Sequence, residues 1–121
     1  MPETIDQVAV ARLLEMVGND PDFVDELVDD YLAEAPQLAA AVRAALDASD
    51  ADGIVLPAHT LKGISANLGG VRVAEIAHGI EERGRAGDLD GMDAMLADLE
   101  VALIELTAAF EQARARRWTS P

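Results

Sequence analysis

Apolar residues recur every three or four positions along almost the whole chain, and this spacing constrains the fold more than any other feature. The clearest series runs through the last third of the chain: Leu89, Met92, Leu96, Leu99, Leu103, Leu106, Phe110 and Ala113. A helix completes a turn every 3.6 residues, so side chains at these intervals share one face. No segment shows the alternation with period two that is typical of strands. The sequence therefore predicts an all-α protein.

Glycine, proline and short polar runs divide this pattern into separate helices. We expect helices over residues 5–17, 21–48, 54–68, 71–85 and 88–116. Asp20 suits an N-cap and Pro21 the first helical position, whereas residues 49–53 predict a turn. Pro36 lies inside the second helix and is expected to kink it. Since short loops join antiparallel neighbours, the expected architecture is an up-down four-helix bundle with a short additional N-terminal helix across one end.

The composition of the 121 residues limits both the core and the chemistry. The length suits one domain, covering residues 1–121. Aromatic residues make up only 3%, so aliphatic side chains must fill the core. The chain has no cysteine, which excludes disulfides, thiol nucleophiles and thiolate metal sites. No apolar run approaches the roughly 18 residues of a membrane span and no signal peptide opens the chain, so we expect a cytoplasmic protein.

The formal net charge of −14 argues against partners that are themselves polyanions. Nucleic acids and anionic membranes both require a positive footprint on the protein. The one basic cluster is formed by Arg114, Arg116 and Arg117 beside Trp118. We expect this cluster to complement the macrodipole at the end of the last helix rather than to bind a ligand.

Residues 58–68 carry an unusual group of side chains away from the expected core. At about 100° per residue, one side of this helix carries Ala58, Leu61, Ile64, Ser65 and Leu68. The opposite, solvent-facing side carries His59, Lys62, Gly63 and Ala66. Glycine inside a helix costs about 1 kcal/mol relative to alanine. No packing demand within the protein explains that cost on an exposed face, so Gly63 is interpreted as clearing space beside the imidazole.

A histidine in this position suits phosphoryl chemistry. Neutral imidazole is a nucleophile near neutral pH, and its attack on a phosphoryl group gives a phosphoramidate. Lys62, three residues after His59, offers a positive charge to the phosphoryl oxygens. We expect no metal site, because the face of His59 carries no second histidine or carboxylate. From spacing alone, an exposed histidine beside a lysine is also compatible with an ordinary helix surface.

The sequence around His59 resembles the signature of the histidine phosphotransfer (HPt) domain. The resemblance rests on HTLKG at residues 59–63 and SANLG at residues 65–69. It extends to VGNDPDFVDELVDDYLAEAPQ, which is similar to the family's long second helix including its proline, and to VAEIAHGIEERGRAGDLDGM, which is similar to its fourth helix and following turn. It covers nearly the whole chain and implies a four-helix bundle, in agreement with the periodicity.

The resemblance also implies roles for individual residues. His59 would carry the phosphoryl group, Lys62 would stabilise that group, and Gly63 would let a partner dock closely. Glu81 matches a polar position that binds the second ring nitrogen in the family, and is a candidate for orienting the imidazole. Arg85 matches a position that is basic in some members, and is a candidate for docking. An ordinary i,i+4 ion pair between Glu81 and Arg85 is the alternative for both.

The expected function is that of a phosphoryl carrier, not an enzyme acting on its own. The chain would exchange a phosphoryl group with response-regulator receiver domains, which would supply the aspartate and Mg²⁺, and would need no cofactor of its own. The chain has no nucleotide-binding motif, so it should not phosphorylate itself from ATP. A sensor or hybrid histidine kinase is a further expected partner. The second histidine, His78, falls outside the motif and is expected to be an ordinary surface residue.

Two alternatives stay open at this point. One is a helical adaptor that binds a receiver or kinase without carrying phosphate; the presence of histidine, lysine and glycine together counts against it. The other is the phosphoacceptor domain of a larger histidine kinase. The chain begins at Met1 and shows no linker, so we expect a stand-alone protein. Because the bundle uses the apolar stripe of every helix, we also expect a monomer.

Overall fold

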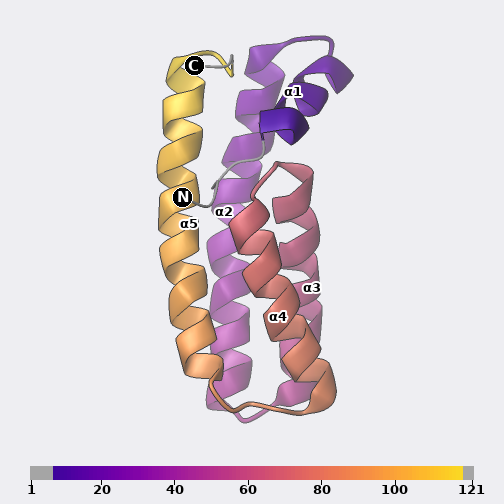
Figure 1. Ribbon diagram of the computed structural model, residues 1–121, viewed down its shortest axis with the longest axis vertical. Helices are drawn as coiled ribbons and strands as arrows, with labels where there is room; N and C mark the ends of the chain where they lie inside the picture. Colours follow the sequence, from indigo (N-terminus) through magenta and orange to yellow (C-terminus); the bar gives the residue numbers. More distant parts are fainter. Residues whose placement is uncertain (1–6, 119–121) are drawn as a thin grey trace.

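The computed structural model describes residues 7–118, and the regular structure in that range is entirely helical (Figure 1). The helices are α1 (Gln7–Met16), α2 (Pro21–Asp47), α3 (Ala51–Asn67), α4 (Val71–Ala86) and α5 (Met92–Ala115). Helices α2 to α5 form an up-down bundle, and α1 packs against α2 at one end. This arrangement confirms the predicted fold class. No helix within residues 7–118 is long and apolar enough to cross a membrane.

The order of the helices around the bundle places two pairs of neighbouring helices on opposite sides. Helix α3 packs against α2 and α4, and α5 packs against α4 and α2, with the most extensive packing between α3 and α4. The α3–α4 side and the α2–α5 side therefore lie opposite each other. As the composition predicts, aliphatic side chains dominate the core, with Tyr31, Phe110 and Trp118 as its aromatic members.

The anchoring of α3 decides which of its residues reach solvent. Ala58, Leu61 and Ser65 are buried, and Ser65 Oγ is 2.8 Å from the hydroxyl of Tyr31 on α2. Ile64, which the wheel places on the same side, is only partly buried. With this stripe fixed against the core, the opposite side of α3 faces outward.

Within the described residues, two helix boundaries differ from the sequence predictions by three residues or more. The turn predicted over residues 49–53 is wrong for its second half, because α3 already begins at Ala51. Asp50 acts as its N-cap, and the Asp50 Oδ1 atom accepts a hydrogen bond from the Gly53 N–H at 3.0 Å. Helix α5 begins at Met92 rather than at residue 88, so Leu89 lies in the connection before it. The predicted start of the first helix, at residue 5, lies outside the described residues.

Helix α2 continues through Pro36 without interruption. Asp20 caps it, and the Asp20 Oδ1 atom accepts a hydrogen bond from the Asp22 N–H at 3.0 Å. Pro36 itself is exposed, on the side of the bundle away from α3. The ring therefore lies at the surface, in the hollow between α2 and α5.

The C-terminal basic cluster does more than complete its own helix, which corrects the sequence interpretation. Arg114 Nη2 lies 2.7 Å from Asp29 Oδ1, and Arg117 Nη2 lies 3.0 Å from Asp22 Oδ1, both on α2. The indole N–H of Trp118 donates to Asp25 Oδ1 at 2.8 Å. The antiparallel packing of α2 and α5 brings the acidic start of one helix beside the basic end of the other. These contacts join the two helices.

Candidate functional site

His59, Lys62 and Gly63 lie together on the outer side of α3, as the helical wheel predicts. The side chain of His59 is 57% exposed, and Lys62 is partly buried beside it. Gly63 is exposed, and a Cβ atom added to it would have no neighbour within 4 Å. The interior of the protein thus gives no reason for a glycine at this position, and the space beside the imidazole is open.

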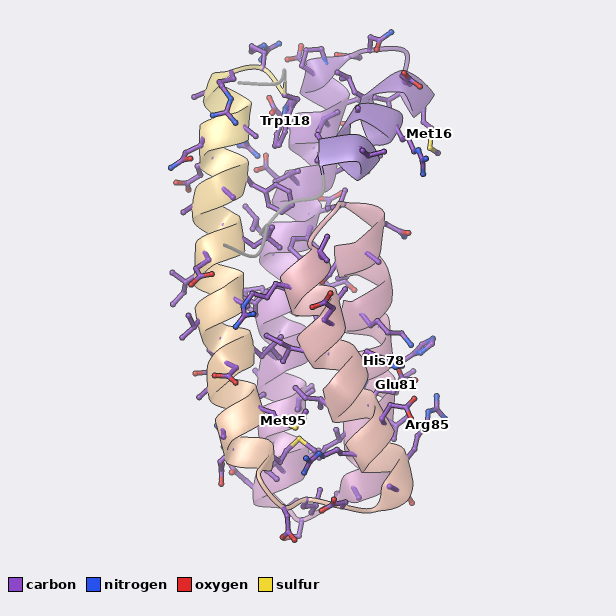
Figure 2. The ribbon with its side chains drawn as sticks, viewed as in Figure 1. Met16, His78, Glu81, Arg85, Met95 and Trp118 are labelled. Carbon is purple, nitrogen blue, oxygen red and sulfur yellow. The ribbon has the colours of Figure 1, made fainter. Side chains whose placement is uncertain are left out.

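A buried carboxylate on α4 connects these residues. Glu81 is only 3% exposed. Its Oε2 atom lies 3.1 Å from His59 Nδ1, and its Oε1 atom lies 2.7 Å from Lys62 Nζ. One turn along α4, Arg85 donates from Nη2 and Nε to the same Oε2 atom at 2.8 and 3.2 Å. Figure 2 shows Glu81 and Arg85 together at the side of the bundle, far from Trp118 at its upper end.

The surroundings of Glu81 decide the state of the imidazole. Lys62, Arg85 and His59 together lower the pKa of Glu81 from 4.5 to about 2, against the opposing effect of burial. An ionised carboxylate can only accept hydrogen bonds, so the proton between the two groups belongs to His59 Nδ1. In the neutral ring, Nε2 then carries the lone pair, and within the described residues it has no hydrogen-bond partner. The geometry presents a nucleophilic nitrogen to solvent.

The cluster is locally positive although the molecule is strongly acidic. Lys62 and Arg85 place two cations against the single carboxylate of Glu81, in a chain whose net charge is −14. An ammonium group has three N–H donors and a guanidinium has five, so neither group is used up by its contact with Glu81. Donors remain for the oxygens of an anion bound at His59 Nε2.

Comparison with known proteins identifies the family. The model of the Hpt domain family matches residues 26–116 of the chain. The chain belongs to the Hpt domain family. It is a histidine phosphotransfer protein of a two-component phosphorelay, in which Hpt domains act as phosphoryl carriers for receiver domains and histidine kinases.

Two solved structures are similar to this Hpt domain. The first, the crystal structure of histidine-containing phosphotransfer protein B (HptB) from Pseudomonas aeruginosa PAO1, is 28% identical with a TM-score of 0.85, over 96% of this chain and 98% of that chain. The second is the HPT domain of the Hpt sensor hybrid histidine kinase from Shewanella. It is 17% identical with a TM-score of 0.72, over 93% of this chain and 95% of that chain, and supports the fold alone. No curated protein sequence matches the chain.

The five candidate residues of this Hpt domain all lie on the α3–α4 side. Helical spacing places His59, Lys62 and Gly63, whereas only the resemblance pointed to Glu81 and Arg85. The i,i+4 pair between Glu81 and Arg85 is present, and it occurs within the cluster rather than apart from it. The sequence interpretation missed the contact of Lys62 with Glu81, because spacing along one helix carries no information about register between helices.

Two further residues frame this site. His78 is exposed, and its Nε2 atom lies 3.8 Å from Glu82 Oε1, so it takes no part in the cluster. Leu56 is an exposed leucine three residues before His59, on the same side of α3. Leu56 was not among the predicted site residues, although its i−3 spacing from the histidine was a usable signal. Within residues 7–118, no group of three or more histidine or acidic side chains could hold a metal ion.

Proposed function

We propose that His59 is the residue that carries the phosphoryl group. The lone pair of Nε2 attacks the phosphorus of an aspartyl phosphate on the partner, a P–N bond forms, and the bond from phosphorus to the aspartate oxygen breaks. The aspartate leaves as a carboxylate. The ring keeps its proton on Nδ1 and becomes cationic, and the carboxylate of Glu81, 3.1 Å from Nδ1, stabilises that charge. The reverse sequence returns the phosphoryl group to a second partner.

Lys62 and Arg85 are proposed to bind the phosphoryl oxygens during this transfer. Both lie against Glu81, so the carboxylate positions them beside the imidazole in advance of the reaction. Each keeps free N–H donors for the incoming anion. The observation that carries the proposal is this single buried carboxylate holding the histidine and two cations together.

The receiver is proposed to dock over Gly63 and the apolar residues around it. Gly63 and Ala66 have little or no side chain, so they leave space for a partner beside His59. Leu56 on α3 and Met16 on α1 are exposed hydrophobic side chains. A hollow of about 530 Å³ lined by Met16 and Ala66 connects the two helices. In this proposal the partner supplies the aspartate and its Mg²⁺, this protein needs no cofactor of its own, and the exchange takes place in the cytoplasm, where receiver domains act.

The test is phosphoryl transfer from a purified, phosphorylated receiver domain of the same genome. We expect label on the wild-type protein that is labile to acid and stable to base. His59→Gln should abolish the label, because the amide has no nucleophilic ring nitrogen, while His78→Gln, a matched exposed histidine, should keep it. Circular dichroism should show that both variants are folded. Label that persists on His59→Gln would refute the proposal.

The same experiment separates the two alternatives. A helical adaptor would bind the receiver equally well with and without His59, and the wild-type protein would take up no label. The phosphoacceptor domain of a larger kinase would take label from an ATP-binding kinase domain and not from any phosphorylated receiver. The proposal predicts instead that transfer from the receiver is reversible.

A further inference from the structure

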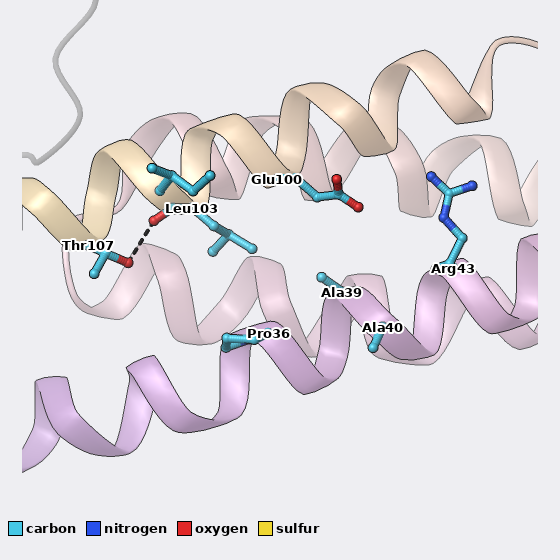
Figure 3. Close-up of a pocket in the computed structure, with 8 residues that line it drawn as sticks. Pro36, Ala39, Ala40, Arg43, Glu100, Leu103 and Thr107 are labelled. Carbon is cyan, nitrogen blue, oxygen red and sulfur yellow. Dashed lines mark hydrogen bonds between the residues drawn. The ribbon is translucent and has the colours of Figure 1, made fainter.

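A second surface of the protein, on the side opposite His59, has features of a binding groove. It lies between α2 and α5 (Figure 3) and has a volume of about 470 Å³. Its lining is mostly apolar or small: Pro36, Ala39, Ala40, Arg43, Glu100, Leu103, Ile104 and Thr107. Because α3 and α4 form the other side of the bundle, nothing that occupies this groove would cover the phosphotransfer site.

Large apolar side chains at the groove are exposed to solvent. Ile104 is 71% exposed at its wall, and Val101 is exposed nearby on α5. On α2, the small side chains of Ala39 and Ala40 leave the groove open on the opposite side. Ile104 and Val101 lie about one turn apart on α5 beside this open hollow, so together they extend its apolar surface.

The charges at one end of the groove are acidic. Arg43 Nη1 lies 2.7 Å from Asp93 Oδ1 and 4.0 Å from Asp47 Oδ1, so its single positive charge is offset by two carboxylates. Glu100 adds a third carboxylate to the lining, close to Arg43. Three negative charges against one positive charge leave this end with a net charge of −2.

We propose that this groove binds an amphipathic helix of a partner protein that carries an apolar stripe flanked by lysine or arginine. The lining extends from Pro36 to Arg43 and from Glu100 to Thr107, eight residues and therefore seven steps on each helix. At 1.5 Å per residue this is about 10 Å, the length of two helical turns. Such a length accepts side chains at i, i+3, i+4 and i+7 of a docked helix.

Charge complementarity decides between this occupant and a second copy of the chain. Two copies would bring together the same acidic groove ends on molecules with a net charge of −14 each. A basic helix instead meets opposite charge at the rim and apolar surface at the centre. The groove would tether a partner while the α3–α4 side stays free for a receiver, an inference that does not depend on which residue carries the phosphoryl group.

The probe for this proposal is a synthetic helical peptide of about 14 residues, with leucine at helical spacing and lysine elsewhere. A peptide of the same composition in scrambled order controls for attraction between opposite charges alone. Fluorescence anisotropy gives the affinity, and amide chemical shifts give the location. We expect the helical peptide to bind at least tenfold more tightly than the scrambled one. It should change the amide chemical shifts of Ala39, Ala40, Leu103 and Thr107.

The protein variants form a matched pair with the same change in charge. Ile104→Glu in the groove should weaken peptide binding at least tenfold, whereas Leu56→Glu on α3 should change it less than twofold. Both side chains are exposed, so the fold should be retained; Ala40→Glu, also exposed, serves if Ile104→Glu does not fold. Equal weakening by Ile104→Glu and Leu56→Glu, shifts centred on α3 and α4, or a wild-type dimer that Ile104→Glu dissociates in sedimentation equilibrium would each overturn the proposal.

Discussion

Two clusters that lie far apart in this molecule, one at the side of the bundle and one at its end, are built from the same parts. Around Glu81, one carboxylate meets two cations and the ring N–H of His59. Around Asp25, one carboxylate meets two cations, Arg114 at 3.4 Å and Arg117 at 3.8 Å, and the ring N–H of Trp118. Each cluster joins two helices, and the kinds of contact are the same in both clusters.

Burial distinguishes the two clusters. The carboxylate side chain of Glu81 is 4% exposed and the ring of His59 is 57% exposed. In the other cluster Trp118 is 5% exposed, whereas the side chain of Asp25 is 24% exposed. One arrangement buries the anion and presents a reactive ring to solvent; the other buries an apolar ring and leaves the anion partly in water. On the proposed function, the same interactions would support transfer in one place and stability in the other.

The strongest way to break this comparison is to remove the buried ring. Trp118→Ala should lower the free energy of unfolding by about 3 kcal/mol, because it deletes a large side chain packed edge-to-face on Phe110, with ring centroids 6.2 Å apart. Phosphoryl transfer at low temperature should be unchanged. Urea unfolding followed by circular dichroism measures the loss. A folded Trp118→Ala variant with impaired transfer would show that the two clusters are not separate in function.

The next largest effect is expected from removing the buried anion. Glu81→Ala should slow transfer about thirtyfold, corresponding to about 2 kcal/mol, because it frees His59, Lys62 and Arg85 at once. Glu81→Gln should slow it only a few-fold, since the amide oxygen still accepts from Nδ1–H. Rapid-quench assays with a phosphorylated receiver provide the rates. Glu82→Gln, on the exposed side of the same helix, is the matched control, and wild-type rates for Glu81→Ala would contradict the positioning role.

The fold was largely predictable because the periodicity of a helix depends only on residues that are close together in the sequence. A spacing of three and four residues gives the helices, and short loops give their antiparallel order. Two helix boundaries were wrong because the same residues suit two roles. Asp50 suits both a turn and an N-cap, and the stretch from Asp88 to Gly91 suits both a loop and a first helical turn. Only the packed structure selects between such roles.

The candidate site was predictable only in part for a related reason. His59, Lys62 and Gly63 lie on the same helix, so their spacing alone predicts that they share one face. Contacts between helices depend on register, which spacing does not give; Glu81 came from the resemblance, and its contact with Lys62 was missed. The pairing of Trp118 with Asp25, 93 residues apart, was missed as well. Complementary charge at the start of α2 and the end of α5 was a signal that could have predicted it.

A smaller effect should separate Gly63 on α3 from Gly84 on α4. Gly63→Leu should slow transfer about tenfold and keep the fold, because the added atoms enter only the space a partner needs. Gly63→Ala should raise the free energy of unfolding by about 0.5–1 kcal/mol. Gly84→Ala is the contrasting control: its Cβ would lie 3.2 Å from the Ala51 carbonyl oxygen, so it should destabilise the protein. Unchanged transfer in Gly63→Leu would refute the clearance argument.

The smallest effect concerns acid stability. The pKa of Glu81 is lowered to about 2, chiefly by Lys62 and then by Arg85, so the ionised form is favoured in the folded state. A depressed pKa stabilises the folded protein above pH 4.5, and this contribution is lost as the pH falls from about 4.5 to about 2. Solvent screens the exposed partners His59 and Arg85, so we expect about 1 kcal/mol in total.

Urea midpoints measured between pH 2 and pH 6 for the wild type and Glu81→Gln would isolate this contribution. The many other carboxylates titrate in both proteins, so only the difference between the two profiles reports on Glu81. That difference should be constant above pH 4.5 and should shrink as the pH falls towards 2. Parallel profiles would mean that the cluster around Glu81 holds the imidazole in place without stabilising the fold. The contrast with the cluster around Trp118 would then be complete: one would serve transfer alone, and the other stability alone.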